Sequence, residues 1–364
     1  MTNNKQMKLL MDTKRIWYVG FCNDNEIERV LNPKTAKDYL LKQRADIISN
    51  HTRFYRVFRA LETYLNSNGL ENCFVDRHYM EYIKLLSRQN KERLESITYG
   101  DIFSNDFNGY ASYDKKFGVI VYLNESLRYF NNFINLALLD QEKSIPESIR
   151  RNALRISIRI ALKTESMDFL LDPRGIVSPA IANMMSETTE DELKFVVGHE
   201  FAHYLCGHLD NSKTDNKVFF SLDSHSYSNK IYTLSQKQEF EADCNSINNV
   251  IGQKDRERLI RAALIWFSSL ELVEYVFDII SPGRSSYTHP SAKERYNKIK
   301  ETFYADDTIK NELNKIRKRV EEYKAFLKED ISLNAENYEM YGSAYLDSPN
   351  TKWRGRELID RVDY

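Results

Sequence analysis

The chain has 364 residues, and an apolar content of 42% is typical of a globular protein rather than a disordered one. The 52 Lys and Arg residues balance the 53 Asp and Glu residues, so the composition predicts no general attraction to nucleic acid or to a membrane surface. Four widely spaced cysteines without a C-x-x-C pair argue against a disulfide framework and favour a reducing compartment.

The first 97 residues are predicted to form a helical region. The amino terminus shows no apolar stretch of the kind found in secretory signals, so we expect a cytoplasmic protein. Apolar residues recur on one helical face over residues 52–68, and Gly69 follows where a glycine commonly ends a helix. Residues 76–89 repeat this pattern. No residue in this region indicates chemistry, which favours a scaffold or recognition role.

The amino-acid composition changes near residue 108, where a stretch rich in turn-forming residues predicts the start of a sheet. Residues 117–123 are aromatic and β-branched and are the best strand candidate in the chain. Residues 147–162 fit both a strand and a helix, and their length favours the helix. Charged residues interrupt the long apolar segment 259–281, which predicts a buried core helix rather than a membrane span. The apolar seam over 309–327 is short for a coiled coil and should pack on the protein itself.

The strongest functional signal lies in residues 189–209. Thr189 and Glu192 match a capping box, which predicts that a helix begins there. His199 and His203 are four residues apart, so both imidazoles lie on one helical face and can reach one metal ion. Glu200 lies beside them and can take a proton from a water without being a ligand.

A catalytic zinc site needs a third protein ligand and an open fourth position. Leu209 stands where the metzincin pattern requires a ligand, which excludes that class. A capping signal at Ser235 predicts a second helix, on which Glu239 and Asp243 share a face. We predict that Glu239 binds the metal and that Asp243 accepts a hydrogen bond from a ligand histidine. Glu241 is the competing ligand.

Several other polar residues have simpler explanations. His208 at a helix end is expected to cap the helix or face solvent, with a supporting role at the site as the alternative. Cys206 and Cys244 are expected to be small core residues rather than ligands.

Two segments together resemble a known family. HEFAH and EFEAD resemble the gluzincin metallopeptidases, whose third ligand is the Glu of an E-x-x-x-D helix. The segment THPSAKER at 288–295 resembles the T-H-P-x-x-x-x-R segment of the HtpX and CAAX-prenyl-protease type of zinc peptidase. By that resemblance His289 would stabilise the oxyanion and Arg295 would brace the site. Tyr287, whose hydroxyl can also donate a hydrogen bond, is the second candidate for the oxyanion.

A further segment resembles the peptide-binding part of the same family. N-G-Y-A at 108–111 is similar to its N-A-F-A turn and edge strand, against which a substrate extends. This implies an edge strand over 117–123 and the substrate-binding residues Asn108, Gly109, Tyr110, Ala111 and Ile120. Because no membrane helix is predicted, the chain looks most like a soluble relative, and it resembles the Lit-type phage-exclusion peptidases.

Taken together, these patterns predict a mainly helical α+β protein. We expect an N-terminal helical region over 1–97, a zincin-like metallopeptidase domain over 98–304 with a small sheet and a peptide-binding edge strand, and a C-terminal helix with an irregular tail over 305–364. The predicted function is zinc-dependent endopeptidase cleavage of an intracellular protein or peptide, regulated or defence-related, with one Zn²⁺ per chain. We expect no nucleic-acid partner and no membrane span, and the sequence does not specify an oligomeric state. The alternative is a non-catalytic binding or regulatory protein in which zinc staples two helices.

Overall fold

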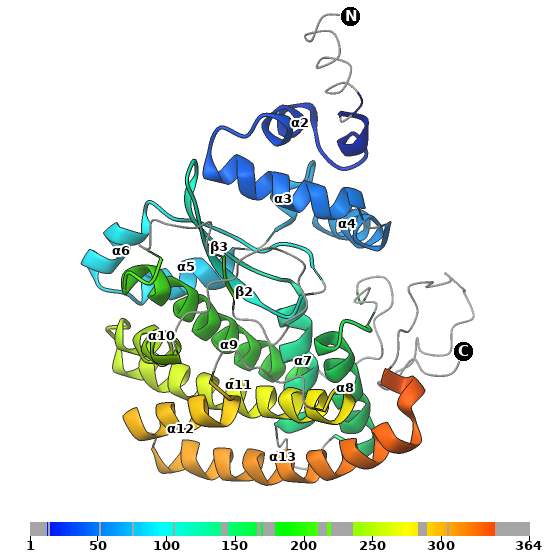
Figure 1. Ribbon diagram of the computed structural model, residues 1–364, viewed down its shortest axis with the longest axis vertical. Helices are drawn as coiled ribbons and strands as arrows, with labels where there is room; N and C mark the ends of the chain where they lie inside the picture. The colour runs from blue at the N-terminus through cyan, green and yellow to red at the C-terminus, as the bar shows by residue number, and fades with distance from the viewer. Residues whose placement is uncertain are drawn as a thin grey trace, which may run out of the picture.

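The protein is mainly α-helical with one small sheet, which confirms the predicted α+β class (Figure 1). The computed structural model describes residues 13, 15–50, 52–74, 76–104, 106–139, 145–165, 169, 179–209, 217–219, 236–282, 290–303 and 306–338.

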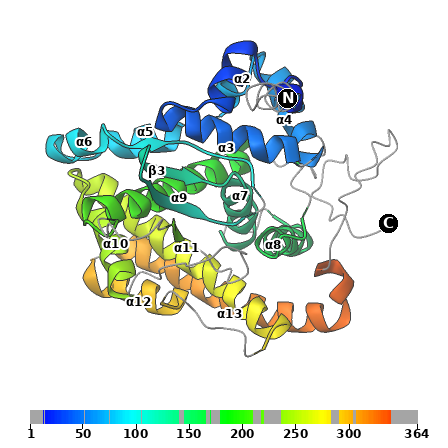
Figure 2. The ribbon, with the colours of Figure 1, turned by 45° about the horizontal axis from the view of Figure 1, so that its top comes forward.

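The N-terminal helices form a separate layer beside the sheet (Figure 2). They are α2 (Asp24–Leu31), α3 (Ala36–Asn50) and α4 (Thr52–Leu65). The next two helices, α5 (Arg77–Lys84) and α6 (Arg88–Leu94), lie outside this layer and contact the long helix α9 (Pro179–Leu205) instead. The helix predicted over 52–68 is confirmed, although α4 ends at Leu65. Gly69 follows with a φ of 101°, a left-handed conformation that glycine adopts without strain.

The sheet has the strand order β1-β3-β2-β4. Its strands are β1 (Thr98–Tyr99), β2 (Gly109–Asp114), β3 (Gly118–Leu123) and β4 (Lys217–Phe219). The strand predicted over 117–123 is confirmed as β3, but the prediction that it is an edge is wrong. β3 pairs in parallel with β1 and antiparallel with β2. The two-residue β1 covers its outer side and is too short to show an alternating pattern in the sequence.

The two faces of the sheet pack against different helices. Tyr110, Ile120 and Tyr122 form a small apolar cluster with Leu40 of α3. Strand residues whose side chains point to the other face of the sheet, such as Ala111, belong to the main core. On that face β2 and β3 contact α9. The sheet therefore separates α3 from the long helix that carries both histidines, whereas α5 and α6 contact that helix directly.

The remaining helices build the main core around α11 (Gln253–Ile280). They are α7 (Ser126–Leu138), α8 (Glu147–Ala161), α9, α10 (Gln236–Asn248), α12 (Ala292–Thr302) and α13 (Asp307–Leu333). The ambiguous segment 147–162 is thus a helix, as its length indicated. Trp266 and Phe267 of α11 are fully buried, and no helix within the described ranges is long and apolar enough to cross a membrane. The seam over 309–327 packs against α11, as predicted.

The predicted helix start at Thr189 is wrong, because α9 already begins at Pro179. Thr189 and Glu192 are instead buried in the middle of this helix. The side-chain amide of Asn135 in α7 donates to the Thr189 hydroxyl at 3.2 Å and to the Glu192 carboxylate at 2.7 Å. These side chains therefore connect two helices, although in sequence they have the same spacing as a helix cap.

Glu192 should make the stability of the protein depend on pH. Burial raises its pKa to about 8, partly offset by the hydrogen bond from Asn135. The folded state therefore keeps a proton that the unfolded chain loses near its ordinary pKa of 4.5, so stability falls as pH rises from there towards 8. Glu192→Gln keeps an oxygen for Asn135 and removes the charge, so we expect it to stabilise the protein by roughly 1–3 kcal/mol at pH 8.5 and hardly at pH 4.5. Urea unfolding at both pH values measures this, and an equal effect at both would contradict it.

Candidate metal centre

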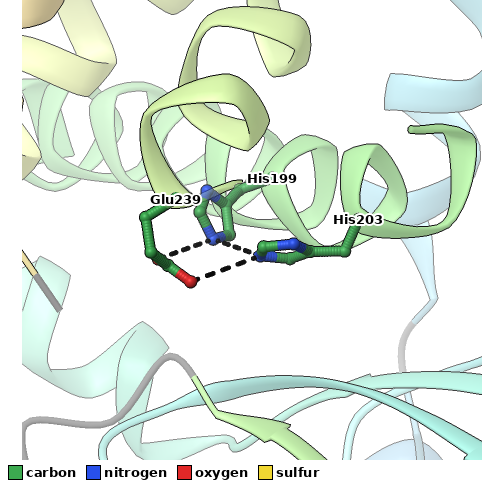
Figure 3. A group of neighbouring side chains, drawn as sticks. All are labelled: His199, His203 and Glu239. Atoms are coloured by element: carbon green, nitrogen blue, oxygen red, sulfur yellow. Dashed lines mark hydrogen bonds and ion pairs between the residues drawn. The ribbon is translucent and has the colours of Figure 1, made fainter. Parts of the chain in front are cut away.

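Helices α9 and α10 bring three metal-ligand side chains together (Figure 3). The Nε2 atoms of His199 and His203 lie 3.0 Å apart. Glu239 lies opposite, with one carboxylate oxygen 3.6 Å from Nε2 of His199 and the other 3.7 Å from Nε2 of His203. Because zinc binds nitrogen and oxygen at about 2.0–2.1 Å in a tetrahedron, its ligand atoms lie about 3.3 Å apart. The three side chains therefore fit a zinc ion.

The choice between the two glutamates of α10 follows from their positions. Glu239 is fully buried and faces the two histidines. The Glu241 side chain is 47% exposed and lies beside His208 instead. The structure therefore brings Glu239 to the histidine pair, and Glu241 does not join it.

Close packing of α9 fixes the position of His199. A Cβ atom on the preceding residue, Gly198, would lie 2.5 Å from the ring of Tyr82 in α5, so only glycine fits there. The Tyr82 hydroxyl donates to the carbonyl of Ser246 in α10 at 2.7 Å. One tyrosine therefore contacts both helices that carry the donor residues.

The far side of His199 is held by a buried ion pair. Its Nδ1 lies 2.8 Å from Asp243, one turn beyond Glu239 on α10. Arg295 of α12 donates from Nε to the same carboxylate at 2.7 Å. Burial alone would raise the pKa of Asp243, but the Arg295 charge, together with the hydrogen bonds from His199 and Arg295, outweighs this and lowers the pKa. A charged Asp243 favours the proton on Nδ1 of His199, which leaves Nε2 free to bind a metal.

The far side of His203 meets His208, whose Nδ1 lies 2.9 Å from Nδ1 of His203. The turn that ends α9 explains this contact. Gly207 has a φ of 76°, and the backbone N–H of His208 donates to the His203 carbonyl at 2.9 Å. Such a glycine turn folds the chain back over the last helical turn. His208 is buried at 8% exposure, so the expectation that it faces solvent is wrong. The sequence signal was the glycine directly before it.

Glu200 lies between the histidine pair and strand β2. It is fully buried, and a Cβ atom on Gly109 would lie 3.0 Å from its carboxylate. Burial and the nearby Glu239 raise the pKa of Glu200 well above its ordinary value. A buried carboxyl group beside the sheet and close to Glu239 is a candidate proton acceptor for a water at the histidine pair.

The predicted substrate residues divide between two places. Gly109 and Ala111 lie beside Glu200, and the Ala111 backbone N–H is directed towards its carboxylate. Asn108 precedes them and is buried, and its side-chain amide donates to the Tyr110 hydroxyl at 3.3 Å. Tyr110 and Ile120 point into the apolar cluster against α3. The structure therefore brings the first pair to the metal centre and not Tyr110 or Ile120.

One protein-family model matches part of the chain. The Peptidase U49 family model matches residues 173–313. The matched segment covers less than half of the chain. It contains His199, Glu200, His203, Glu239 and Arg295. Peptidase U49 is the Lit-type peptidase family, so the match supports a proteolytic function and agrees with that predicted resemblance. No curated protein and no solved structure matches the chain.

The structure describes only some of the other residues that the sequence singled out in the matched segment. Tyr287, His289 and Ser235 lie outside the described residues. Cys244 is half-buried, with its sulfur 4.0 Å from the Thr302 hydroxyl. Cys206, also half-buried, lies within reach of His208 and Glu241 in a second group of potential ligands. That second group bears on the role of His208, which is considered below.

Proposed function

We propose that the protein is a zinc-dependent endopeptidase with His199, His203 and Glu239 as ligands and Glu200 as the general base. The observation that carries the proposal is the donor set itself: two imidazoles and one carboxylate converge, with a second buried carboxyl group beside them. Structural zinc sites usually close with four Cys or His ligands, whereas three ligands leave a position for water and substrate. The Peptidase U49 match supports the same reaction class.

The roles of the residues follow from their positions. Zinc bound there would polarise a peptide carbonyl and lower the pKa of a water at the site. Glu200 accepts a proton from the attacking water and returns it to the leaving nitrogen. Asp243 and Arg295 keep the ring of His199 in place. We further propose, on the family resemblance, that His289 donates to the oxyanion; His289→Ala should lower kcat and leave the zinc content unchanged.

The substrate backbone is proposed to bind at the start of β2. Gly109 lies against Glu200 at the start of this strand. Strand β4 pairs with β2 over Tyr110–Ser112, and the described pairing stops before Gly109. We therefore assign Gly109, the first residue of β2, and the preceding Asn108 to the peptide bond being cleaved. Main-chain pairing of this kind is largely independent of sequence, so side-chain selectivity must arise elsewhere.

The proposed function is tested by asking whether the protein cleaves other proteins and whether this cleavage requires a bound metal. The purified full chain is incubated with a mixture of denatured proteins, and new termini are identified by mass spectrometry. We expect cleavage that disappears after treatment with a chelator and returns with one equivalent of Zn²⁺. Cleavage that is unaffected by complete metal removal would overturn the zinc assignment. Zinc binding without cleavage of any protein, including native cell extract, would favour the stapled, non-catalytic alternative.

Gly109→Ala should lower turnover more than it lowers metal binding. The new Cβ would lie 2.6 Å from the Leu123 side chain and 3.0 Å from the Glu200 carboxylate, so β2 or Glu200 must shift. A displacement of about 1 Å near reacting groups can cost on the order of 100-fold in rate. Steady-state kinetics beside zinc content measure this. Gly118→Asn is the control, because Gly118 lies in the same sheet with open space around it and asparagine tolerates its left-handed φ of 78°. Equal kinetics of the two variants would contradict the assignment.

A further inference from the structure

His203 contacts a second histidine through the nitrogen that faces away from the other donors. Its Nδ1 lies 2.9 Å from Nδ1 of His208, and Nε2 of His208 lies 3.4 Å from a carboxylate oxygen of Glu241. We propose that His208 is a positioning residue for the ligand His203, and that Glu241 orients His208. This inference rests on the proposed zinc centre.

The proton positions in this chain of contacts follow from the ligand role of His203. Two ring nitrogens at hydrogen-bond distance need one proton between them, with a donor on one side and a lone pair on the other. A neutral His203 that uses Nε2 for the metal carries its proton on Nδ1 and is the donor. His208 then accepts at Nδ1 and carries its own proton on Nε2. That proton points to Glu241, which accepts it.

The backbone turn at Gly207, rather than the reach of a long side chain, brings His208 to His203. Gly207 turns the chain so that His208 returns over His203, and a backbone hydrogen bond joins the two residues in addition to the contact of their rings. Glu241 stands two residues after Glu239 on α10, so the relay joins the end of α9 to the helix of the third ligand. A partner on the far nitrogen fixes the rotation of a ligand imidazole and raises its basicity. The pair His208 and Glu241 thus does for His203 what Asp243 and Arg295 do for His199.

A second metal site is the competing explanation for the same residues. Ligand atoms of Cys206, His208 and Glu241 lie within 4.8 Å of one another. Metal binding there requires a lone pair on Nε2 of His208 if Nδ1 is already engaged by His203. The proton arrangement above places a hydrogen on that nitrogen while His203 holds an ion. The geometry therefore favours a hydrogen-bond relay over a second ion.

Zinc affinity of the full-length protein tests the relay. Competition with a chromophoric chelator gives the dissociation constant of the wild type, His208→Leu, His208→Asn and the control Cys206→Ser. We expect His208→Leu to weaken zinc binding 10- to 100-fold, the usual effect of losing such a partner. His208→Asn, whose carbonyl can accept from Nδ1 of His203, should recover most of the affinity, and Cys206→Ser should match the wild type.

Each other outcome overturns the proposal in a distinguishable way. An unchanged affinity in His208→Leu removes the positioning role and leaves the zinc centre intact. A second zinc equivalent that is lost in Cys206→Ser assigns these residues to a second metal site. A wild type that binds no zinc removes the proposed centre itself. A structural defect in His208→Leu is recognised by helical circular dichroism and by the midpoint of unfolding without metal.

Nitrogen-15 NMR of the zinc-loaded wild type gives an answer that needs no variant. Two-bond correlations between ring nitrogens and carbon-bound protons report which nitrogen of each histidine carries its proton. We expect His203 to be protonated at Nδ1 and His208 at Nε2. A His208 protonated at Nδ1 would overturn the relay, whatever the effect of the substitutions.

Discussion

Glu200→Gln should abolish peptide cleavage and leave the zinc content unchanged. Glu200 is next to His199 in the chain but is not one of the three residues whose ligand atoms converge. Glutamine has nearly the same shape as glutamate but cannot accept a proton. General acid–base catalysis contributes about 100- to 10,000-fold to rates, so we expect a loss of at least that order. Product formation under single-turnover conditions measures it.

Metal analysis and thermal unfolding of the same variant provide the control. Because the substitution replaces a buried carboxyl group by a neutral amide, we expect the Glu200→Gln protein to be at least as stable as the wild type. A variant that cleaves at the wild-type rate would show that another residue activates the water. A variant that loses zinc as well as activity would mean that Glu200 takes part in holding the ion, which would contradict the assignment of roles.

His203→Ala and Glu239→Ala should each lose the bound zinc. The wild type is expected to contain about one zinc per chain, since its three donors fit a single tetrahedral ion. Removing one of three ligands leaves two, which cannot hold zinc against a chelator at physiological pH. Metal content after dialysis against a weak chelator, determined by plasma mass spectrometry, measures the loss.

Glu241→Ala is the matched control for Glu239→Ala. The two glutamates are on the same helix two residues apart, and only the first faces the histidine pair. At saturating zinc we expect Glu241→Ala to retain one equivalent, with at most a weaker affinity. If Glu241→Ala loses the metal and Glu239→Ala keeps it, the ligand assignment is reversed. A wild type that takes up no metal would remove the basis of the proposed peptidase.

The sequence predicted those parts of the site that lie on single helices. A spacing of four residues determines the relative direction of two side chains on a helix, so the approach of His199 to His203, and of Glu239 to Asp243, could be foreseen. The long amphipathic and apolar helices α11 and α13 were predictable for the same reason. Local periodicity was sufficient for these features.

Features that depend on contacts between distant segments were not predictable in this way. The neighbour on the outer side of β3 is a two-residue strand, whose pairing depends on where α5 and α6 place the chain. Thr189 and Glu192 have the spacing of a cap, but Asn135 of another helix is their partner. The approach of His208 to His203 depends on a glycine turn whose outcome is visible only in three dimensions.

The charges buried around the histidine pair have a consequence for the folding of the whole chain. Three fully buried carboxyl groups, from Glu200, Glu239 and Asp243, share the site with the guanidinium of Arg295, which is ion-paired with the last two. Because the pKa of Glu200 is raised well above its ordinary value, Glu200 keeps its proton, and the other two carboxylates with one guanidinium leave one negative charge that a divalent cation would offset. Buried charge without a counter-charge opposes folding, so binding of the proposed zinc would contribute its free energy to folding. The supply of zinc would then set how much of this protein is folded, as well as how much of it is active.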